Sequence, residues 1–324
     1  MRTNDRRSSK SMGIGLWLLT IPMISSAVEP ERVCGTRSPD INTLQEMRQV
    51  ALTLRQYSRS FLRTIPGLAE PVRVPTRIHV VSRSDQRGAV SDAVLEEQMR
   101  MLNAAYRPMR IVFQLTLTTR EANDDWFDEV AESEVDSQFM RKINIRGGSD
   151  LLLVVRQPRS IVDGKVKEVL GYAHLPSNIA NGKVPRMFDA VVLDWKSLPR
   201  GEPTTGLGNT TIHEVGHWLG LLHTFEPGTT NAGQVGDGCD PVGDGIDDTN
   251  AQRFAVFACD KVSDTCPAPG RDPLANYMGY GYDSCTSELT PDQSEYALSM
   301  LVQYRPQFLS PNKLGRQIFG DRVK

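Results

Sequence analysis

The residues best suited to chemistry lie within eleven positions, His213 to His223, which read H-E-V-G-H-W-L-G-L-L-H. A helix would place His213 and His217, four residues apart, on one face. Gly220 allows a sharp turn after that helix, so that His223 becomes a third ligand. Three neutral nitrogens leave a tetrahedral zinc ion one open position for water, as in catalytic sites. Glu214 is the expected general base, which takes a proton from that water and delivers it to a leaving amine.

A zinc-bound water with an adjacent base is suited to cleaving peptide bonds, so the motif predicts a broad extracellular zinc endopeptidase. Two other interpretations compete with this one. A secreted binding module with a structural zinc would need four protein ligands and no adjacent glutamate, so Glu214 argues against it. A narrow processing protease, acting on one partner protein, stays open because specificity depends on loop shape. Three of the five histidines lie in the motif, and the other two, His79 and His174, are expected to be packed or surface residues.

Strands and helices alternate in the first half of the chain, which predicts a mixed α/β sheet. Strands are expected at 77–81, 111–117, 151–155 and 190–195, and helices at 42–62, 91–106 and 291–304. In the first helix, Asn42 and Gln45 resemble a capping box. Residues 227–281 are rich in Gly, Pro and Asp, so disulfides and metal ions are expected to hold their shape.

The first 27 residues have the order of a signal peptide. Four basic residues precede a mostly apolar stretch at 12–24, and Ser25-Ser26-Ala27 supplies a cleavage site. No later segment is long and apolar enough for a membrane anchor. The net charge of −2 gives no reason to expect nucleic acid as a partner. The product is therefore expected to be secreted, extracellular and soluble.

Five cysteines remain after that cut. Four of them, Cys239, Cys259, Cys266 and Cys285, lie within 47 residues, and an oxidising compartment favours two disulfides among them. Spacing alone leaves three pairings open. The fifth, Cys34, stands far away in Arg32-Val33-Cys34-Gly35-Thr36.

The stretch from Thr211 to Phe225 resembles the active site of the pappalysin family of metzincin zinc metalloproteases. Its small secreted members, ulilysin and the fungal extracellular metalloproteases, are the most similar. The likeness covers roughly residues 75–305. It continues in Ser91-Asp92, Leu102-Asn103-Ala104-Ala105-Tyr106, Gly243-Asp244, Asp248-Thr249, Asp272-Pro273-Leu274, Asn276-Tyr277-Met278, Tyr282-Asp283-Ser284-Cys285 and Leu289-Thr290-Pro291-Asp292-Gln293.

The resemblance implies an α+β fold of the metzincin type. A twisted mixed sheet and two long helices would lie above the cleft, with an irregular, disulfide-braced lower part. It also implies the pairs Cys239–Cys266 and Cys259–Cys285. Met278 would form the Met-turn, an apolar floor under the imidazoles, and Tyr280 would donate its hydroxyl to the oxyanion.

Relatives bind calcium in the lower part, and Asp244, Asp248 and Thr249 match that loop, with Asp247 as a further candidate ligand. A solvated acidic turn is the alternative. Some relatives prefer a basic residue just after the cut, and Asp283 is a candidate for lining that pocket. Asn209-Thr210-Thr211 is formally a glycosylation acceptor, but Asn209 or Thr210 is expected to cap the active-site helix instead.

Relatives are made as zymogens, and Arg32-Val33-Cys34-Gly35 resembles their cysteine switch, in which a thiolate fills the open zinc position. The alternative is a free or intermolecularly paired cysteine. We therefore expect a signal peptide at 1–27, a pro-segment at 28–70, a catalytic domain at 71–310 and a tail at 311–324. Protein or peptide substrates are the expected partners.

Overall fold

The structure, a computed structural model, describes residues 1, 34–61, 71–144, 147–162, 164–199, 204–226, 237–239, 243–259 and 262–309. The expected signal peptide beyond Met1, both ends of the expected pro-segment (28–33 and 62–70) and the tail at 311–324 lie outside the described residues. All of the architecture below belongs to the unit Arg32–Lys324.

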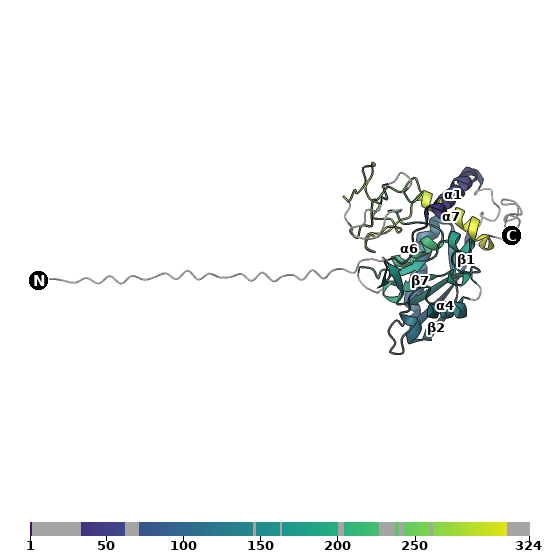
Figure 1. Cartoon of the computed structure of the whole chain (residues 1–324), viewed down its shortest axis with the longest axis vertical. Coiled ribbons are helices and arrows are strands. Elements are labelled where there is room, and N and C mark those ends of the chain that lie inside the picture. The colour runs from purple at the N-terminus through teal and green to yellow at the C-terminus, as the bar shows by residue number, and fades with distance from the viewer. Residues whose placement is uncertain are drawn as a thin grey trace. The chain divides into compact units, whose positions relative to one another are not determined.

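A five-stranded sheet carries the fold (Figure 1). Its strand order is β2-β1-β3-β7-β6. Its strands are β1 (Val72–Ser82), β2 (Ile111–Ala122), β3 (Leu151–Arg156), β6 (Gly171–Ala173) and β7 (Val191–Asp194). The pairs β1–β2, β1–β3 and β3–β7 are parallel, and β6 runs antiparallel to β7 at one edge. A separate hairpin joins β4 (Arg159–Val162) to β5 (Lys165–Glu168).

Helices cover both faces of this sheet. The longer ones are α1 (Ile41–Phe61), α2 (Asp92–Tyr106), α4 (Glu134–Ile143), α6 (Asn209–Trp218) and α7 (Pro291–Tyr304). Short turns of helix are α3 (Asp124–Phe127), α5 (Pro176–Ala180), η2 (Arg107–Met109), η3 (Arg186–Phe188), η4 (Trp195–Ser197) and η5 (Pro306–Phe308). No described helix is long and apolar enough to cross a membrane.

Strand β3 shows how the sheet separates two cores. Its residues are all buried, which is typical of a parallel strand covered on both faces. Leu151, Leu153 and Val155 join the cluster that contains residues of α1, α2, α6 and α7. Leu152 and Val154 join the cluster that contains residues of α3 and α4. The predicted mixed α+β sheet is therefore confirmed, and the active-site helix lies on its larger core.

The N-terminal end of the first helix, α1, differs from the prediction. The helix begins at Ile41, and the Asp40 carboxylate accepts the backbone N–H of Thr43 at 2.9 Å. The expected capping box of Asn42 and Gln45 is therefore wrong, because Asn42 already lies inside the helix. Asp40 stands two positions earlier, directly before the helix, and its carboxylate therefore accepts a free N–H group of the first turn.

The part between α6 and α7 has no regular helix or strand among its described residues. Two disulfides brace it: Cys239–Cys266, with an S–S distance of 2.05 Å, and Cys259–Cys285, at 2.12 Å. These are the pairs that the family resemblance implies. Short cross-links between loops provide order where few apolar side chains are available.

Candidate metal centre

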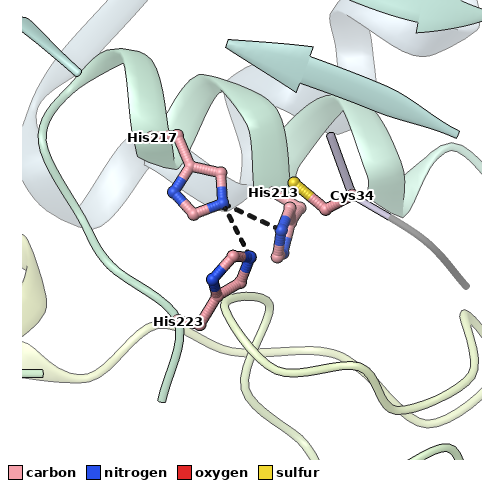
Figure 2. A group of neighbouring side chains, drawn as sticks. All are labelled: Cys34, His213, His217 and His223. Carbon is pink, nitrogen blue, oxygen red and sulfur yellow. Dashed lines mark hydrogen bonds between the residues drawn. The ribbon is translucent and has the colours of Figure 1, made fainter. Parts of the chain in front are cut away.

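Helix α6 and the turn after it bring the three predicted histidines together. Gly220, with φ 92°, ends the helix in the left-handed region that favours glycine. Its N–H donates to the carbonyl of His217 at 2.9 Å, and the chain then returns toward the helix. The Nε2 atom of His217 lies 3.0 Å from that of His213 and 3.2 Å from that of His223 (Figure 2). All three imidazoles are buried.

In each ring the other nitrogen, Nδ1, contacts a hydrogen-bond acceptor. Nδ1 of His213 lies 2.7 Å from the carbonyl oxygen of Tyr277, and Nδ1 of His217 lies 2.8 Å from that of Leu221. A carbonyl oxygen can only accept, so Nδ1 carries the proton in both rings and Nε2 presents its lone pair. For His223 the acceptor is the Glu226 carboxylate, at 3.0 Å.

This donor set fits a zinc ion. Nitrogens about 2.0–2.1 Å from a tetrahedral zinc lie roughly 3.3–3.4 Å apart, close to the spacing seen here. The Cys34 sulfur joins the group, since the four candidate ligand atoms all lie within 4.8 Å of one another. Burial, together with neighbouring His223, lowers the pKa of His217 well below its usual value, which keeps that ring in the neutral form a metal needs.

Glu214 lies against the edge strand of the sheet. Its side chain is fully buried, and Oε2 accepts a hydrogen bond from the Thr36 hydroxyl at 3.0 Å. A Cβ atom added at Gly171 in β6 would lie only 2.8 Å from Cγ of Glu214. The absence of a side chain at Gly171 thus allows the strand and the expected general base to touch.

Cys34 belongs to a short segment that runs beside β6. The N–H of Gly35 donates to the carbonyl of Gly171 at 2.8 Å, and the Ala173 N–H donates to the Thr36 hydroxyl at 2.9 Å. The Cys34 sulfur lies 3.5 Å from Oε2 of Glu214. Burial, and to a lesser extent the charge of Glu214, raises the pKa of the Cys34 thiol well above its usual value. Cys34 forms no disulfide.

Met278 and Tyr280 occupy the floor and one wall of the centre. Met278 is fully buried, and a Cβ atom at Gly216 would lie 2.4 Å from its sulfur, so the thioether packs directly on α6. The Tyr280 ring centroid lies 5.2 Å from that of His223. Its hydroxyl accepts the backbone N–H of Cys34 at 3.2 Å. Tyr280 thus faces the position that the Cys34 segment occupies.

The candidate calcium ligands have other partners in the structure. The buried Asp244 carboxylate accepts the Thr249 hydroxyl at 2.8 Å, and burial raises the pKa of Asp244 to about 7. Asp248 accepts the Thr290 hydroxyl at 2.6 Å and the Asp292 N–H at 2.9 Å, at the start of α7. Among the described residues, only the cysteine–histidine group converges as a metal site would. Calcium stays a prediction.

The start of α6 is built differently from the prediction. Gly208 is the N-cap, and the Asn209 amide instead donates to the carbonyls of Asp283 at 2.8 Å and Thr286 at 3.1 Å. Capping by Asn209 or Thr210 is therefore wrong. The Asp283 carboxylate accepts the N–H groups of Leu207 at 2.9 Å and Asn209 at 3.4 Å, so a residue far along the chain supports the helix start.

Several residues at the centre were not identified from the sequence. Thr36 contacts the expected base, and the Ser38 hydroxyl donates to Oε1 of Glu226 at 2.7 Å. Glu226 follows His223 by three residues, and this short spacing could have indicated a contact between the two side chains. Burial raises the pKa of Glu226 to about 7. Asp189 binds the indole N–H of Trp218 at 2.8 Å, and nothing in the local sequence indicates that contact.

Comparison with known proteins identifies relatives of this chain. The peptidase M43 family model, described as Pregnancy-associated plasma protein-A, matches residues 156–301. The chain is 32% identical over 295 residues to an extracellular metalloprotease of Pyricularia oryzae, covering 90% of this chain and 96% of that protein. It is 35% identical over 241 residues to extracellular metalloprotease 1 of Coccidioides posadasii, covering 74% and 80%.

Two solved structures share the fold. A promirolysin mutant from Tannerella forsythia aligns with a TM-score of 0.61 at 22% identity, over 86% of this chain and 97% of that one. Mature mirolysin from the same organism, in complex with a cleaved peptide, aligns with a TM-score of 0.58 at 24% identity, over 74% and 96%.

Proposed function

Because the chain belongs to the peptidase M43 family of pregnancy-associated plasma protein-A and is a metalloendopeptidase, we propose that it is a secreted zinc enzyme whose metal is held by His213, His217 and His223. The observation that carries the proposal is the convergence of three Nε2 atoms, each on a ring whose Nδ1 has its own acceptor. The names of the relatives, extracellular metalloproteases, support secretion.

When bound, zinc would lower the pKa of a water molecule and polarise the scissile carbonyl. Glu214 would accept the proton of that water at Oε2, the atom to which Thr36 now donates, and pass it to the leaving amine. The close approach of Gly171 to Cγ of Glu214 would limit how far this side chain can move. Tyr280, whose hydroxyl points to the same space, would donate to the negative charge that develops on the carbonyl oxygen.

Residues 28–70 are proposed to form a pro-segment that keeps the enzyme latent, and residues 71–310 the catalytic domain. Three contacts support this. The Cys34 sulfur lies among the histidine nitrogens, Thr36 donates to the expected base, and Gly35 pairs with the edge strand β6. A peptide substrate has to displace this segment from the site, so the segment lowers activity until it is removed, and loss of the Cys34 thiol should make that displacement easier. The signal peptide at 1–27 and the tail at 311–324 complete the proposed organisation.

The test compares the matured protein with Glu214→Ala on a proteome-derived peptide library, with a zinc chelator as a second control. Glu214→Ala and chelation should each abolish cleavage, since one removes the base and the other the metal. Cleavage by Glu214→Ala at the parent rate would show that the mechanism is wrong. The same library separates a broad endopeptidase from a narrow processing enzyme, and enrichment of Arg or Lys after the cut would support a role for Asp283.

Latency is tested in the uncleaved chain. Cys34→Ala removes the thiol but leaves the Gly35 and Thr36 contacts, so the uncleaved variant should cleave peptides faster than the uncleaved parent. Equal rates for the two uncleaved forms would exclude Cys34 as a switch.

A further inference from the structure

The three proposed metal-binding rings differ in the acceptor that their Nδ1 atom contacts. Two rings donate to main-chain carbonyls, those of Tyr277 and Leu221. The ring of His223 instead faces a side-chain carboxylate, with Nδ1 3.0 Å from Oε1 of Glu226. Both side chains of this pair are 2% exposed. A buried carboxylate in this position is a stronger acceptor than a carbonyl and carries charge as well.

The difference matters because His223 lacks the support of a helix. His213 and His217 project from α6, whose backbone sets their directions. His223 lies beyond Gly220, where the structure assigns no helix or strand. Its ring is stacked on Phe225, with centroids 4.8 Å apart and planes 10° apart. Stacking sets the plane of the ring but does not distinguish its two orientations, which are related by a flip about the Cβ–Cγ bond that exchanges Nδ1 with Cδ2. The Nδ1 contact must therefore select between them.

We propose that Glu226 is the positioning residue of the third metal ligand: its carboxylate turns Nε2 of His223 toward the metal and adds a negative charge behind that ligand. The inference rests on the proposed zinc site. Acceptors of this kind orient histidine ligands and raise their basicity, and their loss typically weakens metal binding about 10- to 100-fold.

The same oxygen is shared with the expected pro-segment. The Ser38 hydroxyl donates to Oε1 of Glu226 at 2.7 Å, while His223 donates to it at 3.0 Å. Ser38 is exposed and belongs to the segment that maturation would remove, whereas Glu226 stays in the catalytic domain. Glu226 therefore keeps its function in the matured enzyme, and Ser38 only supplements it before maturation.

The experiment measures zinc affinity of the folded protein by competition with a chromophoric chelator. Glu226→Ala removes both the hydrogen bond and the charge and should weaken zinc binding about 10- to 100-fold. Glu226→Gln keeps an acceptor of the same size but removes the charge, so its affinity should lie between those of Glu226→Ala and the parent. Ser38→Ala in the full chain should bind zinc within about twofold of the parent.

A matched control separates positioning from general stability. Asp272 is another buried carboxylate of the lower part, bonded to the hydroxyls of Ser263 at 2.6 Å and Thr265 at 2.9 Å. Asp272→Asn should lower the melting temperature of the metal-free protein and leave zinc affinity unchanged. If the folded Glu226→Gln and Glu226→Ala variants both bound zinc within twofold of the parent, the inference would be wrong. A parent that failed to bind zinc would instead overturn the proposed function.

Discussion

Asp189→Asn breaks a buried ion pair that holds the end of the active-site helix. Arg305, the residue after α7, donates to both carboxylate oxygens of Asp189 at 2.8 Å. The guanidinium lies 3.6 Å over the Trp218 ring and donates to the Trp218 carbonyl at 3.2 Å. Asp189 also accepts the indole N–H of Trp218 at 2.8 Å. Trp218 is the last residue of α6 and directly follows His217.

The expected cost follows from burial. The side chains of Arg305 and Asp189 are 3% and 4% exposed, so the substitution leaves a guanidinium charge without its counter-charge away from water. Breaking such a pair typically costs about 3–5 kcal/mol. For a domain of this size, about 2–4 °C of melting temperature is lost per kcal/mol, so a decrease of roughly 6–20 °C is expected.

Urea unfolding of the zinc-loaded, disulfide-intact protein measures this cost. Glu97→Gln serves as the control, because the side chains of Arg100 and Glu97 are 68% and 37% exposed and an exposed pair contributes only about 0–1 kcal/mol. The double variant Asp189→Leu with Arg305→Met should recover part of the loss, since it leaves no buried charge. A loss below about 1 kcal/mol for Asp189→Asn would refute the reasoning.

Three further predictions concern the base, the sheet and the acidic loop. Gly171→Ala places a Cβ atom 2.8 Å from Cγ of Glu214 and should displace that side chain. The kcat of the matured enzyme should then fall tenfold or more, to about a hundredth if Glu214 moves by about 1 Å. Gly279→Ala, whose added Cβ has its nearest contacts at 3.4 Å, is the control and should be tolerated, and equal kcat values for the two variants would contradict the prediction. Burial raises the pKa of Asp194 from 3.8 to about 6, so the folded chain keeps a proton that the unfolded chain loses, and stability should fall by up to about 3 kcal/mol as pH rises from about 4 to 6. Asp194→Asn should flatten this decline in urea unfolding, and parallel curves for the two proteins would argue against it. Calcium added to the zinc-loaded, calcium-free parent should raise its melting temperature but not that of Asp244→Asn, and no rise in the parent would exclude the expected calcium site.

The parts of the fold that sequence predicted well are those with a strong local pattern. The helix expected at 291–304 matches α7, because Thr290 and Gln293 form a capping box at its start and Pro291 stands at its first position. The strand expected at 151–155 matches β3, whose continuous apolar run is typical of burial on both faces. The strand expected at 77–81 is only the second half of β1, since Pro75 obscured the first half.

The parts that were missed depend on contacts between distant residues. Strand β6 has three residues, too few to show a period, yet it forms the wall beside Glu214. Helix α4 was not predicted, because its polar sequence resembled a loop. The same limit applies to the candidate site. The histidine spacing predicted three converging rings, whereas the contact of Thr36 with Glu214 spans 178 positions and has no local pattern.

Glycines on both sides of the sheet edge explain how one strand can meet the base and the expected pro-segment. A Cβ atom at Gly171 would lie 2.8 Å from Cγ of Glu214, and one at Gly35 would lie 3.1 Å from Cβ of Ser160. The Gly35 N–H donates to the Gly171 carbonyl at 2.8 Å, so the two backbones also pair with each other at this edge. If residues 28–70 are removed as proposed, that carbonyl loses its donor at the edge of the sheet, where an extended chain can pair with it. Release of the segment would then free the base, the metal position and a main-chain acceptor together, so a bound peptide would restore the hydrogen bond that maturation removed.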